Sequence, residues 1–317
     1  MKNLKLFFVF LIIAPFSYAQ EIEEKLEEVK YRNIGPFRGG RSVSSVGVVN
    51  DPLTYYMGTA GGGLWKTTNA GSEWFNISDD YFKTSSVGAI AVSESDSRII
   101  YVGMGEHSPR GVTTSYGDGI YKSTDAGETW EHLGLDNTQQ ISRIIIHPDD
   151  NNIVYVAAQG AINGPTKERG VYKSIDGGKT WKNVLFVNEL SGASELSIDI
   201  NNPKVLYATM WEHQRLPWKV ISGGEGSGVY KSTDGGENWF KIENGLPDEL
   251  GKLAISVSRA NSNKVYLLAE SDTNKRLGGL FVSNNAGESW SRVSKFAELT
   301  SRAWYYIEVF ADPNDEN

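Results

Sequence analysis

Residues 123–130 read Ser-Thr-Asp-Ala-Gly-Glu-Thr-Trp, and this eight-residue pattern predicts the architecture of the chain. Written as Ser/Thr-x-Asp/Asn-x-Gly-x-x-Trp, it occurs five times, at residues 67–74, 123–130, 174–181, 232–239 and 283–290. Successive tryptophans are 56, 51, 58 and 51 residues apart. That spacing is near the length of one four-stranded sheet with its loops, so each copy marks one structural repeat.

Short alternating strands surround every copy of the pattern. In the third repeat, residues 141–146 and 153–157 alternate in strand fashion on either side of a polar turn, and residues 171–173 lead into the next copy. Each repeat thus supplies two strands, a loop, a third strand, the patterned turn and a fourth strand that starts at the tryptophan. We predict an all-β propeller with five complete four-stranded blades and, at residues 303–310, the start of a sixth.

The pattern itself has a structural explanation. A tight reversal needs a residue with positive φ, which glycine supplies, and an Asp or Asn side chain that accepts hydrogen bonds from the turn's own amides. The tryptophan can then cover the turn and bury its ring between blades. We therefore interpret these positions as scaffold rather than as catalytic or metal-binding residues: Asn69, Trp74, Asp125, Trp130, Asp176, Trp181, Asp234, Trp239, Asn285 and Trp290.

The first nineteen residues have the features of a secretory signal peptide. Lys2 and Lys5 precede an apolar stretch, and Ser17-Tyr18-Ala19 resembles a cleavage site. The apolar run is about half the roughly 20 residues that a membrane-spanning helix needs. We expect a signal peptide at 1–19, a linker at 20–30 and the propeller at 31–317, in a secreted or periplasmic protein without a membrane span.

Composition narrows the range of partners. The chain has no cysteine, which excludes disulfides and zinc-thiolate sites, and its formal net charge of −8 becomes −10 once Lys2 and Lys5 are removed. An acidic protein is a poor partner for nucleic acid. The four histidines show no metalloprotease spacing and no phosphate-binding loop is present, so we predict neither a metal nor a cofactor.

The opening of a sixth repeat suggests that the sequence is partial. An unfinished blade would leave an open strand edge, whereas propellers usually close with four to eight blades. We expect further C-terminal blades or another domain of the same protein; self-association to complete the ring is the alternative.

The repeats resemble the Asp-box, or bacterial neuraminidase repeat, propellers, a group that includes sialidases, xyloglucanases, photosystem assembly factors and the sortilin-type receptor domain. The resemblance covers residues 31–317. The segment 31–41, with Gly39-Gly40-Arg41, and the segment 61–66 look like large exported bacterial proteins described as sortilin-like or glycosyl hydrolase. This resemblance implies the fold, and it implies an activity only by analogy.

Two enzyme families of this group match the chain poorly at their catalytic motifs. Xyloglucanases of this architecture have an Asp near the N-terminus in a segment that corresponds to residues 59–62 here, and Ala60 stands at its place. The Arg-Ile-Pro signature of sialidases is at best faintly matched by Phe37-Arg38-Gly39.

The longer loops before the third strands are the candidate binding regions, because such loops gather at one face of a propeller. They carry Glu106, Arg110, Trp211, Glu212, Arg215 and Trp218. Two exposed tryptophans beside charged groups would suit a sugar ring or an aromatic peptide side chain, although both could equally cover the adjacent blade. Glu106 and Glu212 could also form a carboxylate pair for glycoside hydrolysis, which requires a specific separation.

The sequence therefore favours a secreted scaffold that binds a peptide or carbohydrate ligand. The alternative is a glycoside hydrolase, similar to a xyloglucanase or sialidase, whose catalytic acids lie partly outside this chain.

Overall fold

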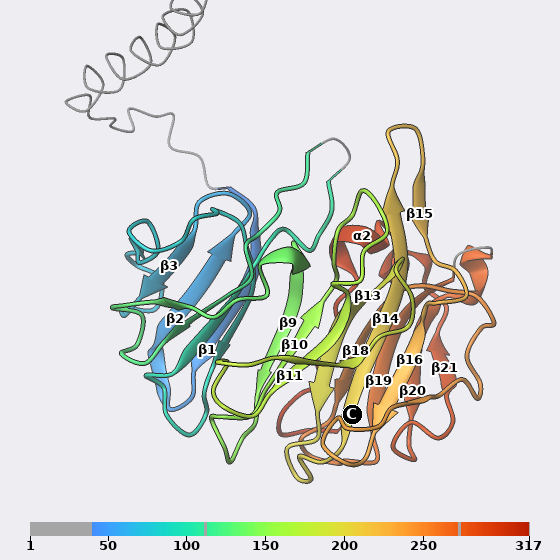
Figure 1. Cartoon of the computed structure of the whole chain (residues 1–317). Helices are drawn as coiled ribbons and strands as arrows, with labels where there is room; N and C mark the ends of the chain where they lie inside the picture. Colours follow the sequence, from blue (N-terminus) through green and yellow to red (C-terminus); the bar gives the residue numbers. More distant parts are fainter. Residues whose placement is uncertain (1–39, 111–112, 272–273, 317) are drawn as a thin grey trace, which may run out of the picture. The chain divides into compact units, whose positions relative to one another are not determined.

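The computed structural model of the protein describes residues 40–110, 113–271 and 274–316. These residues form five antiparallel sheets, and Figure 1 shows them following one another along the sequence colours, from the blue sheet to the red one. The predicted all-β fold of four-stranded blades is confirmed. The predicted signal peptide, the linker and residues 31–39 lie outside the described part of the chain.

Each blade takes four consecutive strands in sequence order, from the innermost to the outermost. Blade one contains β1 (Ser42–Val48), β2 (Asp51–Thr59), β3 (Leu64–Thr67) and β4 (Phe75–Asn76). Blade two contains β5 (Val87–Val92), β6 (Ile100–Met104), β7 (Ile120–Ser123) and β8 (Glu131–His132). Blade three contains β9 (Ile141–Ile146), β10 (Val154–Ala158), β11 (Gly170–Ser174) and β12 (Lys182–Leu185).

Blade four carries one additional strand. It contains β13 (Ser191–Ile198), β14 (Leu206–Arg215), β16 (Gly228–Ser232) and β17 (Phe240–Lys241), and β15 (Val220–Ser222) pairs with the far end of β14. Blade five contains β18 (Leu250–Val257), β19 (Val265–Ser271), β20 (Gly279–Ser283) and β21 (Ser291–Ser294). The helical segments are 3₁₀ turns at Asp136–Thr138, Lys275–Leu277 and Ala297–Thr300, and one α-helical turn, α2, at Ala303–Tyr306.

The apolar core lies between neighbouring blades rather than within one sheet. Tyr56, Leu64 and Val102 belong to one buried cluster that joins blades one and two, and equivalent clusters join each later pair. The box tryptophans contribute to these interfaces: the Trp130 indole N–H donates to Ile77 O at 3.0 Å, and that of Trp181 donates to Leu133 O at 2.9 Å. The fourth strand starts one residue later than predicted, because the tryptophan still belongs to the turn.

Two regions differ from the sequence-based expectation. The stretch 211–228, expected as a loop, instead extends β14 to Arg215 and returns as β15, so it forms a hairpin. Residues 303–310, expected to open a sixth blade, begin with helix α2, but the following chain lies beside β18, where the Ala311 amide donates to Ser256 Oγ at 3.0 Å. An equivalent hydrogen bond joins blades four and five, where the Val257 amide donates to Ser197 Oγ, also at 3.0 Å.

Candidate functional site at the end of the channel

The innermost strand of every blade pairs irregularly with its neighbour near its N-terminal end. Each strand has a register shift against its neighbour, of the kind produced by a β-bulge. A bulge leaves a residue unpaired and redirects its side chain, and bulges are common beside functional sites. The residues at these five irregularities are Val43, Gly88, Ser142, Ser194 and Lys252.

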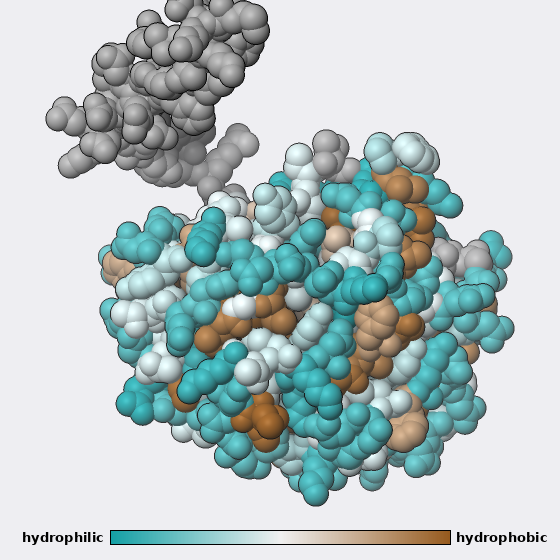
Figure 2. Space-filling view, viewed as in Figure 1, coloured by the Kyte–Doolittle hydropathy of each residue, from teal (hydrophilic) through white to brown (hydrophobic). Residues whose placement is uncertain are grey.

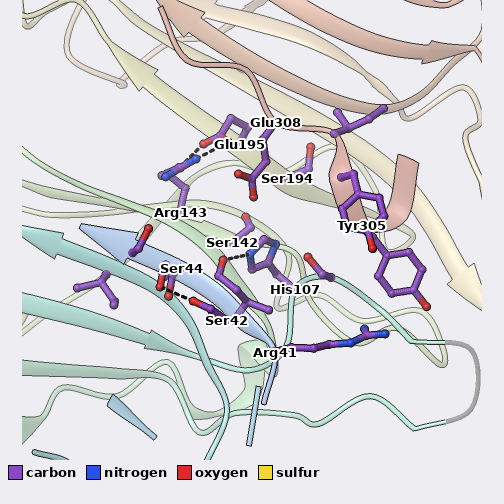
Figure 3. A pocket seen from close by; sticks show the side chains of 18 of the residues that line it. Arg41, Ser42, Ser44, His107, Ser142, Arg143, Ser194, Glu195, Tyr305 and Glu308 are labelled. Atoms are coloured by element: carbon purple, nitrogen blue, oxygen red, sulfur yellow. Dashed lines mark hydrogen bonds and ion pairs between the residues drawn. The ribbon is translucent and has the colours of Figure 1, made fainter. Parts of the chain in front are cut away.

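All five of these residues line one cavity of about 490 Å³. Arg41, His107, Arg143 and Glu195 also line it, and residues 305–308 and Phe310 supply a further wall. Figure 3 shows the labelled side chains around this space; they come from the inner strands and the residue before β1, from the loop after β6, and from α2 with the segment that follows it. The bulges thus convert the channel end into a polar pocket.

Serine hydroxyl groups form hydrogen bonds between neighbouring blades at this pocket. The Ser142 hydroxyl donates to Ala193 O at 2.8 Å, and the Ser194 hydroxyl donates to Leu253 O at 3.1 Å, so each reaches the innermost strand of the next blade. Gly88 allows an equally close approach, because a Cβ there would lie 2.3 Å from the Ile141 carbonyl oxygen. The walls of the pocket are therefore fixed by contacts between blades.

An ion pair crosses the pocket wall between blades three and four. The Arg143 guanidinium donates through Nε to one Glu195 carboxylate oxygen, and through NH2 to the other at 2.7 Å. Bidentate pairing of this type fixes both side chains in one orientation. Figure 3 shows Glu308 next to this pair; desolvation in the pocket raises the pKa of Glu308 against the opposing effect of the Arg143 charge.

A second group of charges lies at the start of β1. The Arg41 guanidinium carbon lies 5.1 Å from the centre of the Tyr305 ring, and Arg41 NH1 lies 3.9 Å from Glu106 Oε1. Glu106 is fully buried and is held more closely by Arg110, at 2.7 Å from its Nε. Arg41 is therefore oriented by the face of the Tyr305 ring and by the Glu106 carboxylate, which it shares with Arg110.

The pocket also contains two buried nitrogen groups. Burial lowers the pKa of His107 to about 3, so this imidazole is neutral at physiological pH, and its Nδ1 has no hydrogen-bond partner among the described residues. Lys252 is 3% exposed, and its ammonium donates to Trp304 O at 3.0 Å.

The opposite end of the channel is apolar. A smaller cavity there is lined by Val46, Ile90, Ile144 and Ile198, among other residues, and the Arg259–Glu94 ion pair lies at its edge. The polar and charged side chains described above therefore gather at the bulged end, while this end carries mainly aliphatic side chains with one ion pair.

Comparison with known proteins supports the fold assignment. A family model described as sortilin, neurotensin receptor 3, matches residues 118–242. A xyloglucanase from a Paenibacillus species is 23% identical over 306 residues, which are 84% of this chain and 27% of the relative. Xyloglucanase Xgh74A from Acetivibrio thermocellus is 25% identical over 268 residues, which are 75% of this chain and 29% of the relative.

Among solved structures, an ancestral GH74 enzyme superposes with a TM-score of 0.61 at 20% identity, covering 80% of this chain and 33% of that one. The chain has the fold of a β-propeller with four-stranded blades joined through Asp-box turns. It spans about a third or less of the length of these relatives. At this level of identity the structural similarity establishes the fold and not the activity.

Within this propeller, each Asp-box is a turn, and its polar side chains accept hydrogen bonds from backbone amides of the same turn. In the second box, Ser123 Oγ accepts from the Gly127 amide at 2.8 Å, and Asp125 Oδ1 accepts from the Thr129 amide at 2.9 Å. The bond from the Thr129 hydroxyl, followed by this amide bond, lowers the pKa of Asp125 to about 2. The described residues include no cluster of three or more side chains suited to a metal ion.

The six candidate binding residues are spread over different environments. Glu106, which is fully buried, and Arg110, which is partly exposed, form the ion pair beside Arg41. Trp211 is fully buried and stacked on His213 with ring centres 4.3 Å apart, so of the two alternatives left open for this side chain, exposure to a ligand and burial against a blade, it takes the second. It is buried because β14 carries it into the blade rather than into a loop.

The other three lie along the β14–β15 hairpin. Glu212 accepts a hydrogen bond from the Gly226 amide at 3.0 Å, and the Arg215 amide donates to Ile162 O at 2.8 Å. Trp218 is 81% exposed at the hairpin turn. Figure 1 shows the hairpin rising at the same end of the sheets as α2, and Figure 2 shows apolar surface on it among hydrophilic neighbours.

None of the six predicted residues is part of the cavity lining, whereas Arg41, Arg143, Glu195, Lys252 and Glu308 are. The sequence did contain a signal for two of them. Arg143 and Glu195 are charged residues in inner strands that otherwise consist of apolar or small residues. A charged residue in a buried strand requires a partner or a function. No sequence pattern linked them to Arg41 or Glu308.

Proposed function

We propose that the Asp-box propeller binds a glycan at the bulged end of its channel. The observation that carries this proposal is the composition of the pocket, in which serine hydroxyls and tyrosine rings outnumber aliphatic side chains. Sugar rings present hydroxyl groups at their edges and apolar faces above and below, which suit hydroxyl partners and aromatic rings respectively.

Two residues that line the pocket carry a buried polar atom with no hydrogen-bond partner among the described residues, namely Ser44 Oγ and His107 Nδ1. Tyr306 is 67% exposed at the rim. Trp218, on a hairpin at the same end, would supply a second stacking surface for a longer chain.

The relatives point in the same direction, since those quoted above carry the name xyloglucanase. A secreted protein of this kind, with residues 1–19 as an export signal, would encounter glycans outside the cell. A peptide ligand is the main competing class, and the binding experiment distinguishes the two.

Isothermal titration with xyloglucan-derived oligosaccharides tests the proposal. Tyr306→Ala and Trp218→Ala are expected to weaken binding about 3- to 10-fold each, because each removes one stacking surface. Phe240→Ala is the matched control: Phe240 is 63% exposed on the outermost strand of blade four, and its removal should change nothing. Absence of heat with neutral and acidic oligosaccharides alike, with the protein folded, would refute glycan binding.

A glycoside hydrolase is the second candidate, favoured by the names of the curated relatives and by two carboxyl groups in the pocket. The raised pKa of Glu308 is the property that a general acid needs, while Glu195 is held by Arg143. Release of reducing ends from xyloglucan, abolished by Glu308→Gln or Glu195→Gln, would establish this activity. Turnover sensitive instead to Glu106→Gln or Glu212→Gln would move the active site to the loops. Binding without any turnover would leave the protein a glycan-binding scaffold.

A further inference from the structure

The charges that line the pocket do not balance. Arg143 and Glu195 neutralise each other through two contacts, and Arg110 is the closer partner of Glu106. Arg41 and Lys252 then remain as two cations, against Glu308 as one carboxylate. The chain as a whole has a formal net charge of −8, whereas the charged side chains that line this pocket sum to one positive charge.

Lys252 is the more constrained of these two cations. It is 3% exposed, its ammonium lies 5.5 Å from the centre of the Trp211 ring, and Trp304 O accepts its one side-chain hydrogen bond within the described structure. No carboxylate of the described residues lies within ion-pair distance of it. An ammonium has three donors, so this side chain retains capacity toward the cavity that it lines.

Burial of this ammonium also affects its pKa. Burial lowers the pKa of Lys252 to about 8, even though Glu308, Glu195 and Glu270 act in the opposite direction. A buried cation that lacks a close counter-ion is retained at a cost in stability, and an anionic ligand would remove that cost.

Arg41 faces the same space from the first blade. Its side chain is 51% exposed, and it is oriented over the Tyr305 ring. Arg41 precedes β1 and Lys252 lies in β18, so the two cations approach the cavity from the first and fifth blades, with the Tyr305 segment contributing to the wall. Guanidinium groups on an aromatic support are well suited to a planar carboxylate.

We propose that this pocket recognises an acidic glycan, with the carboxylate of a uronic-acid residue bound between Arg41 and Lys252. The inference rests on the proposed glycan binding and adds the class of sugar. One carboxylate matches the excess of one positive charge, and the surrounding serine hydroxyls and tyrosine rings would hold the neutral part of the same sugar.

A matched pair of ligands tests this directly. Xylotriose and the same trisaccharide carrying one glucuronosyl branch differ by a single acidic sugar, and isothermal titration gives the ratio of their dissociation constants. We expect the acidic compound to bind about tenfold more tightly, as for one charge-assisted contact, and this preference to shrink as ionic strength rises.

Three variants identify the residues responsible. Lys252→Met and Arg41→Gln should each bring the ratio of the two dissociation constants close to one, because each removes one partner of the carboxylate. Lys182→Met is the control, since Lys182 is exposed on the outer strand of blade three, where it pairs with Glu237. Should Lys252→Met fail to fold, as judged by circular dichroism, Arg41→Gln, at an exposed position, still tests the claim.

The outcomes separate the two proposals. Equal affinity for the two xylotrioses, with glycan binding intact, would overturn the acidic-sugar inference and leave the proposed function standing. Failure of all oligosaccharides to bind would overturn both. Binding of a short peptide through its free C-terminal carboxylate, lost on amidation and without glycan binding, would likewise overturn both and assign the carboxylate to a peptide.

Discussion

At the scale of the residue, the fourth position of the box is alanine in three copies and glycine in the other two. This residue has a positive φ in every copy, at 56° for Ala70, 61° for Ala126 and 55° for Ala286, and at 73° and 75° for Gly177 and Gly235. An L-residue with a side chain is disfavoured in this region by roughly 1–2 kcal/mol, whereas glycine is not. Three boxes therefore hold an alanine under backbone strain that the other two avoid.

Ala126→Gly should consequently stabilise the protein, by about 0.5–1 kcal/mol once the greater freedom of glycine in the unfolded chain is subtracted. Chemical denaturation measures the change. The reciprocal substitution Gly235→Ala should destabilise by a similar amount, because a Cβ there would meet no atom closer than 3.7 Å and strain alone would act. Stabilisation by both substitutions would contradict this account of the turn.

At the scale of the element, a tyrosine and a lysine join each of the first four blades to the next one. Both side chains donate hydrogen bonds to the same backbone carbonyl oxygen, that of the fourth residue in the Asp-box of the next blade. In blade three, the Tyr155 hydroxyl and the Lys173 ammonium both donate to Gly235 O of blade four, each at 2.8 Å. The same two contacts join the other neighbouring blades through Tyr56 with Lys66, Tyr101 with Lys122, and Tyr207 with Lys231.

Blade five departs from this rule. Tyr266 is present and donates to Glu316 O, but Val282 stands at the position of the lysine. The contact that follows blade five therefore uses one donor where the four others use two.

A double-mutant cycle on Tyr155→Phe and Lys173→Met tests the paired contact. Either single change should cost about 1 kcal/mol, because the carbonyl keeps one donor. The double variant should cost more than the sum, since the acceptor then loses both partners. Additive free energies of unfolding would indicate that the two donors act independently.

At the scale of the molecule, the pocket depends on contacts between blades, and the Arg143–Glu195 ion pair is one that lines the pocket itself. Glu195 is 8% exposed and Arg143 33% exposed on their side chains. Removing one partner leaves a charge without its counter-ion, which is the costly way to break such a pair.

Glu195→Gln should therefore lower the free energy of unfolding by about 1–3 kcal/mol, less than for a fully buried pair because Arg143 retains some solvent. The double variant Arg143→Met with Glu195→Gln should recover part of this loss, since no unpaired charge remains. A double variant less stable than Glu195→Gln would show that the arginine stabilises the fold through its packing instead.

The sequence by itself determined the repeated elements: five boxes, their spacing, the four-stranded blades and the order of strands within each. It could do so because a turn is specified by neighbouring residues, through hydroxyl, carboxylate and glycine positions that lie within eight residues of one another. Only the tertiary structure decided the pocket. Arg41, Arg143, Glu195, Lys252 and Glu308 are spread over most of the described chain, and they meet because five bulges at one level turn the inner strands toward a common space. The burial of Trp211 was likewise decided by pairing, because strand β14 continues past the point where the sequence predicted a loop.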